Sequence, residues 1–401
     1  MLKDKKILLC LCGGIAVYKC VDLASMLVKA GATVKTIMTE SAMEFVTPLT
    51  FKSITKESVS YKMFNPEAPI EHISLADWAD LIVIAPATAN IIGKIANGIA
   101  DDLLSTTVMA AKCPKLIVPA MNVNMWENPI VQENIGKLKR LERRQKEYLV
   151  LEPDKGVLAC GYEGKGRLPA VEEIVYAIKA ALYVKTPRVQ SSIKVLVTAG
   201  ASVERIDPMR HITNVSSGKM GLALARVAYL RGAEVTIIHS SISEKLPYYT
   251  HNIEALSAQE MYAEVMKVYK DFDIIIMCAA VADYTPESPS KHKIKKKDDM
   301  AISLIRTKDI LLELGKSKRA EQVLIGFAAE SENLIENAKE KLIKKNLDVI
   351  VANDLSNAGK SDSEIFVLKK GSDSVEQYGG EKFLLANEIF DSVIAVSQAG
   401  G

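Results

Sequence analysis

The sequence contains no run of about 20 apolar residues, the length that a membrane-spanning helix requires. Its first apolar run, Ile7 to Cys12, is short and leads into Gly13-Gly14 without the cleavage pattern of a signal peptide. The six cysteines form no Cys-x-x-Cys pair and have no His-rich partners, so neither a zinc site nor a disulfide framework is indicated. We therefore expect a cytoplasmic protein without a membrane partner.

A strong charge of either sign is also absent. The 51 basic residues are offset by 49 acidic residues, which leaves a formal net charge of +2 at pH 7. Such a balance gives no global positive field that would hold a nucleic-acid backbone by counterion release. We therefore expect no nucleic-acid partner.

The chain is long and rich in hydrophobic residues. Its 401 residues exceed the roughly 250 to 300 that one hydrophobic core usually serves. Hydrophobic residues make up 48% and charged residues 25%, a balance typical of globular proteins. These numbers predict two domains, each with its own core.

The order strand, turn, helix, strand occurs twice along the chain. In the first half it comprises the run Ile7 to Cys12, a helical pattern from Val17 to Val28, and a second run from Val34 to Met38. In the second half it returns as Ile193 to Thr198, Met220 to Leu230 and Val235 to His239. Further buried strands are expected at Leu81 to Ala85, Leu116 to Pro119, Ile274 to Ala279 and Val323 to Ala328.

Continuous apolar runs of this kind suit parallel strands that are covered on both faces. The predicted fold class is therefore α/β, with two doubly wound Rossmann-like domains whose ligands bind beyond the carboxyl ends of the strands. Between the two halves, residues 185–192 lose periodicity and carry Pro and Ser. We place the domains at residues 1–188 and 189–401.

Two common nucleotide fingerprints are missing. Neither first turn carries Gly-x-Gly-x-x-Gly, so a nicotinamide dehydrogenase is a poor fit. A loop that starts near Thr198 leads to Ser216-Ser217-Gly218-Lys219-Met220-Gly221, which lacks the Walker A spacing and excludes a P-loop NTPase. Gly13-Gly14 at a helix start still lets backbone amides approach a phosphate, which favours a mononucleotide such as FMN over a dinucleotide.

Four separated segments of the first half carry a family resemblance. They are Glu71 to Asp80, Ala85 to Asn90, Pro119 to Trp126 and Leu158 to Arg167. They resemble the signature segments of the phosphopantothenoylcysteine decarboxylase family of flavoproteins, including its Pro-x-Met-Asn-x-x-Met-Trp motif. The last segment resembles that family's substrate-covering flap, and its glycines suggest a mobile, accessible loop.

The resemblance implies an FMN cofactor and three catalytic residues. His72 would act as the base, Asn122 would hold the substrate carboxylate, and Cys160 would protonate the ene-thiolate product. Each has a structural alternative: a histidine satisfied by a neighbour, a turn asparagine, and a half-buried thiol. The residues implied to hold FMN are Gly13, Gly14, Thr39, Pro86, Thr88, Asn90, Ser105 and Thr106.

One departure from the bacterial relatives concerns Cys12, which stands where they often carry Ser. If that hydroxyl helps to bind the FMN phosphate, affinity here would depend more on backbone amides, Thr39 and the Ser105-Thr106 pair.

The second half resembles the phosphopantothenate-cysteine ligase domain. The resemblance rests on five segments: Ile212 to Gly221, Cys278 to Tyr284, Lys293 to Lys296, Gly326 to Glu330, and Lys345 to Asp348 with Asn353-Asp354. It implies activation of a carboxylate by CTP, with Mg²⁺ held mainly through the triphosphate. Asn214 would handle the acyl-cytidylate and Lys293 would assist activation. The alternative for Asn214 is a turn asparagine; the basic run Lys291 to Lys297 could be a solvated loop, an interpretation that we assign to Lys296 and Lys297. The residues implied to contact CTP are Ala279, Ala280, Asp283, Lys293, Asp309, Ile310, Phe327, Lys341 and Lys345.

The whole chain resembles the fused bifunctional enzyme of coenzyme A biosynthesis. Its implied substrates are 4'-phosphopantothenate, L-cysteine and CTP, and its implied product is 4'-phosphopantetheine. The resemblance also implies trimeric decarboxylase contacts and dimeric ligase contacts, hence a large homo-oligomer such as a dodecamer. A degenerate ligase half and a regulatory flavoprotein subunit are the rival interpretations, and the choice of CTP over ATP stays open.

Overall fold

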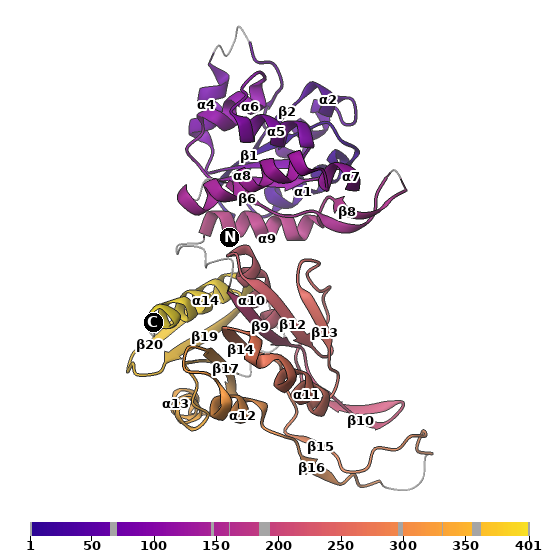
Figure 1. Ribbon diagram of the computed structural model, residues 1–401, viewed down its shortest axis with the longest axis vertical. Coiled ribbons are helices and arrows are strands. Elements are labelled where there is room, and N and C mark those ends of the chain that lie inside the picture. Colours follow the sequence, from indigo (N-terminus) through magenta and orange to yellow (C-terminus); the bar gives the residue numbers. More distant parts are fainter. Residues whose placement is uncertain are drawn as a thin grey trace. The chain divides into compact units, whose positions relative to one another are not determined.

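The computed structural model describes residues 2–64, 70–145, 148–159, 161–183, 193–295, 300–330, 332–354 and 362–399. The chain divides into two compact units, Met1–Lys185 and Thr186–Gly401. Each unit contains a sheet with helices packed around it (Figure 1). The boundary predicted at residues 188 and 189 lies outside the described residues.

The first unit is built on a six-stranded parallel sheet with strand order β3-β2-β1-β4-β5-β6. Its strands are β1 (Lys6–Leu11), β2 (Thr33–Met38), β3 (Val59–Ser60), β4 (Leu81–Ala87), β5 (Lys115–Pro119) and β6 (Tyr148–Val150). A separate antiparallel hairpin joins β7 (Asp154–Val157) to β8 (Glu163–Arg167). The helices are η1 (Ile15–Tyr18), α1 (Lys19–Lys29), α2 (Glu40–Met43), α3 (Pro48–Thr55), α4 (Glu71–Trp78), α5 (Ala89–Asn97), α6 (Leu103–Ala110), α7 (Val123–Trp126), α8 (Pro129–Gln145) and α9 (Val171–Tyr183).

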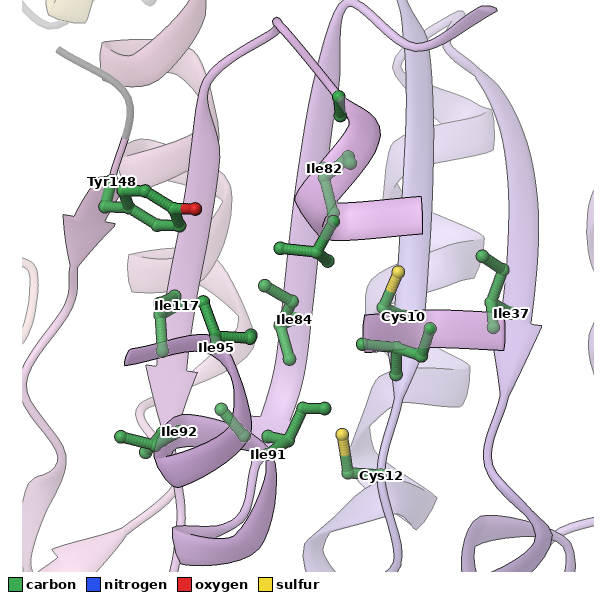
Figure 2. Close-up of a cluster of buried hydrophobic side chains, with 14 of the residues drawn as sticks. Cys10, Cys12, Ile37, Ile82, Ile84, Ile91, Ile92, Ile95, Ile117 and Tyr148 are labelled. Carbon is green, nitrogen blue, oxygen red and sulfur yellow. The ribbon is translucent and has the colours of Figure 1, made fainter. Parts of the chain in front are cut away.

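Both faces of this sheet are covered, which explains why its strands read as continuous apolar runs. Helices α1 and α9 pack together and against strands, while α5 and α8 form another packed pair. One core cluster joins side chains of the central strands, such as Cys10 and Ile84, to Ile91 and Ile95 of α5 (Figure 2). The arrangement is the predicted doubly wound one.

The second unit has an eight-stranded sheet with order β13-β12-β9-β14-β17-β18-β19-β20. Its strands are β9 (Lys194–Ala199), β12 (Glu234–His239), β13 (His251–Glu254), β14 (Ile274–Met277), β17 (Val323–Glu330), β18 (Val349–Asp354), β19 (Asp362–Lys369) and β20 (Val375–Glu381). Two small hairpins pair β10 (Val203–Asp207) with β11 (Arg210–Thr213) and β15 (Tyr284–Pro286) with β16 (Leu304–Arg306). The helices are α10 (Lys219–Leu230), α11 (Ala258–Val268), η2 (Tyr269–Asp271), α12 (Ile310–Ser317), α13 (Leu334–Lys344) and α14 (Lys382–Ala399).

The predicted repetition between the halves extends to individual hydrogen bonds. In the first unit the carboxylate of Asp80, just before β4, accepts from the N–H of Lys6 at 2.9 Å. In the second unit Asp273, just before β14, accepts from the N–H of Lys194 at 2.8 Å. Each aspartate satisfies a backbone donor at the first residue of the central strand, so both sheets begin in the same way.

Two features of the second unit differ from the sequence prediction. Strands β19 and β20 are antiparallel, whereas a parallel sheet was expected. The connections before them span residues 355–361 and 370–374, which are shorter than the dozen or so residues that a parallel crossover needs. The loop expected after Thr198 contains the β10–β11 hairpin, because Asp207 accepts from the N–H groups of Met209 and Arg210 and closes a tight turn around Pro208.

No helix among the described residues is long and apolar enough to cross a membrane.

Candidate functional site

A pocket of about 1430 Å³ lies at the carboxyl ends of the strands of the first unit. Its walls come from the turns after β1, β2, β4 and β5, together with the β7–β8 hairpin. This is the edge at which doubly wound sheets bind their ligands. The predicted site residues that line it are Gly13, Gly14, Thr39, Thr88, Asn90 and Asn122.

Gly13 allows the turns after β1 and β2 to approach closely. A Cβ at this position would lie 2.3 Å from Cβ of Ser41 and 2.9 Å from its backbone oxygen. Thr39 and Thr88 cap short helices that begin at the pocket: Thr39 accepts from Ala42 N–H at 3.2 Å and Thr88 from Ile91 N–H at 3.4 Å. Helix N-termini at a pocket wall favour an anionic ligand.

The lining does not include Pro86, Ser105 or Thr106. Pro86 is buried within β4, and Ser105 is 1% exposed. The Ser105 hydroxyl donates to Asp102 at 2.9 Å, while Asp102 accepts the Ser105 N–H at 2.7 Å, so this side chain completes the N-cap of α6. Thr106 Oγ1 is buried without a hydrogen-bond partner among the described residues.

A charged trio that the sequence prediction missed does line the pocket. Lys94 contacts Asp101 at 2.7 Å and Asp102 at 2.8 Å. Burial alone would raise the pKa of Asp102, but the hydrogen bonds from Lys94 and from Ser105 hold that pKa below its usual value. The pair Asp101-Asp102 directly before an apolar run was the available sequence signal.

Cys12, the departure from the relatives, lines the same pocket and is 2% exposed. Burial raises the pKa of its thiol to about 12. Cys12 is therefore a neutral group beside the Gly13-Gly14 turn at physiological pH.

His72 lies in α4, outside the pocket lining. Helix α4 packs against α6, whose cap Asp102 lines the pocket, and Glu71 accepts from Ser60 Oγ at 2.5 Å. Ser60 precedes the pocket-lining segment Tyr61 to Phe64. The Nδ1 atom of His72 is buried and has no hydrogen-bond partner in the described part of the chain.

Asn122 caps α7 with its side-chain oxygen, which accepts from Asn124 N–H at 2.8 Å. The preceding residue, Met121, donates its N–H to the carbonyl of Gly166 in β8 at 2.9 Å. A Cβ on Gly166 would lie 2.3 Å from the Met121 oxygen, so the hairpin and the Asn122 turn need this glycine to meet. Cys160, expected in a mobile and accessible flap, lies outside the described residues.

In the second unit, several predicted nucleotide contacts are joined to one another. Lys345 forms an ion pair with Asp309 at 2.8 Å, and Lys341 donates to the carbonyl of Phe327 at 3.0 Å. Burial lowers the pKa of Lys341, and the neighbouring Lys345 lowers it further; Glu330, Asp309 and Asp283 act in the opposite direction. The side chain of Ile310 is buried in the core, which leaves its backbone at the α12 N-terminus for ligand contact.

A second group forms at the end of β14. Ala279 N–H donates to Thr198 Oγ1 at 3.1 Å, and Ala280 N–H donates to the Gly200 carbonyl at 2.8 Å. Asn214, at the end of the β10–β11 hairpin, donates its side-chain amide to the Ala280 carbonyl at 3.3 Å. The structure thus brings Asn214 to the predicted nucleotide strand.

Lys293 stands apart from both groups. Its side chain is exposed, and no hydrogen bond or ion pair links it to the Asp309–Lys345 group in the ranges that the structure describes. A cavity of about 500 Å³ beside β12 is lined by residues such as His239 and Leu246, and its lining includes none of the residues predicted to contact CTP.

Known proteins match both units in the order of the two predicted domains. Residues 1–183 match the family described as Flavoprotein, and residues 190–396 match the family described as DNA/pantothenate metabolism flavoprotein C-terminal domain. The Coenzyme A biosynthesis bifunctional protein CoaBC of Bacillus subtilis is 49% identical over 363 residues, which cover 90% of this chain and 88% of the relative. The chain belongs to the family of bifunctional coenzyme A biosynthesis proteins.

Other members of this family are similar over most of their length. The CoaBC protein of Borreliella burgdorferi is 44% identical over 378 residues, which cover 92% of this chain and 94% of the relative. A solved structure of the C-terminal domain of a CoaBC protein is 38% identical, covers 52% of this chain and 96% of its own, and has a TM-score of 0.45.

The family membership confirms the predicted α/β fold class and the predicted enzyme of coenzyme A biosynthesis with a decarboxylase and a ligase half. The roles of the individual site residues stay predictions.

Proposed function

We propose that this member of the bifunctional coenzyme A biosynthesis family ligates 4'-phosphopantothenate to L-cysteine with CTP and then decarboxylates the adduct with FMN. The observation that carries the proposal is the match of both halves to the family, with a ligand-sized pocket at the predicted edge of the flavoprotein half. The presence of Asn214, Asp283, Lys293 and Lys345 together argues against a degenerate ligase half.

The pocket of the first unit fits FMN. Its lining includes the Gly13-Gly14 turn, where a Cβ on Gly13 would collide with Ser41, and its volume of about 1430 Å³ exceeds what a mononucleotide and a small substrate need. Gly13, Gly14 and Thr39 would hold the phosphate, and Thr88 and Asn90 would contact the rest of the flavin. When bound, FMN supplies the redox chemistry, taking a hydride from the carbon that bears sulfur and later returning it.

The side chains of this half then handle protons and charge. His72, which lies outside the pocket lining in this unit, is proposed to take a proton from the substrate as the general base. Asn122 offers its amide N–H to the substrate carboxylate, since its oxygen already holds the α7 cap. A neutral donor suits this carboxylate, because a cation would stabilise it against leaving as carbon dioxide. Cys160 is proposed to protonate the ene-thiolate that remains.

The second unit activates a carboxylate. An oxygen of 4'-phosphopantothenate attacks the α-phosphorus of CTP, and the bond to the bridging oxygen breaks with release of pyrophosphate. The cysteine amine then attacks the acyl carbon, CMP leaves, and the amine gives up its proton. Lys293, Lys341 and Lys345 would offset the repulsion between these anionic reactants.

The described residues contain no cluster of three or more His, Cys, Asp or Glu side chains that would hold a metal ion. We therefore propose that Mg²⁺ binds mainly through the triphosphate of CTP, as it commonly does in nucleotide enzymes.

We also propose a homo-oligomer in the cytoplasm, with trimeric contacts in the first half and dimeric contacts in the second. Exposed large apolar side chains, such as Leu49, Ile130, Val215 and Ile343, are candidates for these contacts.

Product analysis tests the proposed function. The purified protein is incubated with 4'-phosphopantothenate, L-cysteine, Mg²⁺ and CTP, with ATP in a parallel reaction, and the products are identified by mass spectrometry. We expect 4'-phosphopantetheine with CTP and an absorbance band of oxidised flavin in the protein. Accumulation of the cysteine adduct alone would refute the decarboxylase assignment, and no adduct with either nucleotide would refute the ligase assignment.

A further inference from the structure

Asp207 is a buried carboxylate that accepts more hydrogen bonds than the β10–β11 turn requires. Its side chain is 0% exposed, and its Oδ1 accepts from Met209 N–H at 2.8 Å and Arg210 N–H at 2.9 Å. These two bonds close the β10–β11 hairpin. The second oxygen, Oδ2, accepts from Nε of Arg210 at 3.0 Å, from its Nη2 at 2.5 Å, and from the N–H of Ile294 at 3.1 Å.

Both backbone polar groups of Ile294, its N–H and its carbonyl, are hydrogen-bonded to the hairpin. Its N–H donates to Asp207, and its carbonyl accepts from Arg210 Nη2 at 2.9 Å. Just before it in the chain, Ser290 donates its N–H to the carbonyl of Ile206 at 2.9 Å. The segment from Ser290 to Ile294 is therefore fastened to the hairpin at both ends, and Lys293 lies within it.

The hairpin also leads directly to Asn214. Thr213, the last residue of β11, donates its hydroxyl to the Ser202 carbonyl at 2.8 Å, and Asn214 follows with its bond to Ala280. One small hairpin thus connects the backbone beside Lys293 to the backbone beside Asn214. In the proposed ligase reaction these two residues act on the same reacting carboxylate.

The ion pair between Asp207 and Arg210 strengthens the link between the hairpin and Ile294. The hydrogen bonds from Arg210 hold the pKa of Asp207 well below its usual value, so the carboxylate remains ionised throughout the working pH range. Bonds from a guanidinium to a carboxylate are shorter and stronger than neutral ones. Lys293 itself is exposed, and its Nζ has no partner among the residues that the structure describes, so its position depends on the backbone around it.

We propose that Asp207 is a positioning residue of the ligase half, which holds the backbone next to Lys293 and so orients this lysine toward the nucleotide. The bonds that do this run from the Ile294 N–H to Asp207 and from Arg210 to the Ile294 carbonyl, and we call them the clasp. The inference rests on the proposed function, because it needs Lys293 to assist carboxylate activation. When a catalytic group is held in place before the substrate arrives, its conformational freedom does not have to be lost on the way to the transition state. Misplacement of such a group by about 1 Å can lower a rate by up to roughly 100-fold.

The test uses the full-length protein with Asp207→Asn. This change keeps the size of the side chain and one oxygen for the turn, but it removes the charge that pairs with Arg210. Asp373→Asn, at an exposed turn of the same unit, is the matched control for the loss of one negative charge. Two rates are measured: trypsin cleavage between Lys293 and Ile294, and pyrophosphate release from CTP and 4'-phosphopantothenate without cysteine.

For Asp207→Asn we expect at least tenfold faster cleavage at this bond, and pyrophosphate release with a kcat roughly 10- to 100-fold lower at a nearly unchanged KM for CTP. Asp373→Asn should match the wild type in both assays. Faster cleavage with an unchanged kcat would overturn the proposal, and so would a lower kcat with unchanged cleavage.

A double-mutant cycle separates the clasp from general damage to the fold. If Asp207 acts through Lys293, adding Asp207→Asn to Lys293→Gln should lower pyrophosphate release by less than about twofold. A full further decrease would show that Asp207 acts by another route and would overturn the inference. If Lys293→Gln alone leaves the rate unchanged, the proposed function of Lys293 fails, while the cleavage assay still reports separately on the clasp.

Arg210→Lys provides a second variant in case Asp207→Asn does not fold. It keeps a cation for Asp207 but removes the donor to the Ile294 carbonyl. We expect a change in the same direction in both assays, and wild-type values in both would contradict the clasp.

Discussion

In the first half of the chain, Gly13, Thr39 and Thr88 line one pocket of about 1430 Å³, whereas in the second half four of the residues predicted to hold CTP bond to one another in pairs. Lys345 pairs with Asp309, and Lys341 donates to Phe327. In both halves these predicted residues lie at or near the carboxyl ends of parallel strands. The flavin half offers a cavity shaped by backbone, while in the ligase half the proposed CTP contacts would require these charged side chains to exchange their present partners for the nucleotide.

This difference follows from the ligands that each half is proposed to take. A resident cofactor gains from a preformed cavity, since little has to be reorganised when it binds. A triphosphate that enters and leaves in each cycle needs cations that stay satisfied between cycles, because an unpaired buried charge is unfavourable. The two halves should therefore respond to different kinds of change.

The largest expected effect breaks the flavin half alone. His72→Asn removes the proposed base, and decarboxylation of supplied 4'-phosphopantothenoylcysteine should fall by roughly 10²- to 10⁴-fold, the usual contribution of a general base. Adduct formation by the other half should stay at the wild-type rate. Carbon dioxide release measures the first and pyrophosphate release the second. His251→Asn, on an exposed strand, is the control, and a full decarboxylation rate in His72→Asn would remove the base role from this residue.

The next effect breaks the ligase half alone. Lys293→Gln should lower pyrophosphate release from CTP and 4'-phosphopantothenate by roughly 10²- to 10³-fold, as expected when a group that stabilises developing charge is lost. The same protein should still decarboxylate the adduct. Lys291→Gln changes an exposed neighbour in the same segment and should keep its activity. Equal rates in both variants would move the activating role elsewhere.

A smaller effect tests whether the flavin half depends on shape. Gly13→Ala places a Cβ 2.3 Å from Cβ of Ser41, and relief of such overpacking costs about 1 to 3 kcal/mol. At about 1.4 kcal/mol per factor of ten, FMN affinity should fall by roughly 5- to 140-fold. Flavin absorbance of the purified protein and titration with free FMN measure this loss. Gly93→Ala, where the nearest atom lies at 3.8 Å, should retain its flavin, and equal loss in both variants would contradict the steric account.

The smallest effect tests whether the ligase half depends on charge. Burial, together with Lys345, lowers the pKa of Lys341, so its positive charge is lost as pH rises through a value below that of an ordinary lysine. KM for CTP should therefore rise a few-fold at pH values below about 10.4, where an ordinary lysine still keeps its charge. Lys341→Arg keeps its charge over this range and should flatten the rise. The same slope in both proteins would exclude Lys341 as its source.

Many of the strands and several pocket residues were predictable from the sequence, because local patterns encode them. Every residue from Ile7 to Leu11 is buried, as a covered parallel strand should be. Asp80 and Asp273 occupy equivalent positions in the two halves, each just before a buried strand and bonded to the first residue of the neighbouring central strand. Asn122 and Thr88 lie in the pocket because the motifs that contain them form helix caps at a strand end.

What the sequence did not reveal depends on contacts between distant segments. Ser105 was expected at the flavin phosphate, yet its hydroxyl completes the α6 cap with Asp102. Lys94 lines the pocket because α5 packs against α6, which no local pattern encodes. The clasp of Ile294 by Asp207 joins positions 87 residues apart. Such contacts are set by tertiary packing, so they became visible only in the folded chain.

Complementation between two inactive proteins tests the central claim, that the halves are independent sites linked by a free intermediate. His72→Asn and Lys293→Gln are assayed singly and mixed, with 4'-phosphopantothenate, L-cysteine, Mg²⁺ and CTP. The account predicts that each variant alone yields little 4'-phosphopantetheine, that His72→Asn accumulates the cysteine adduct, and that the mixture forms the final product. A mixture that stays inactive while the adduct accumulates would contradict it.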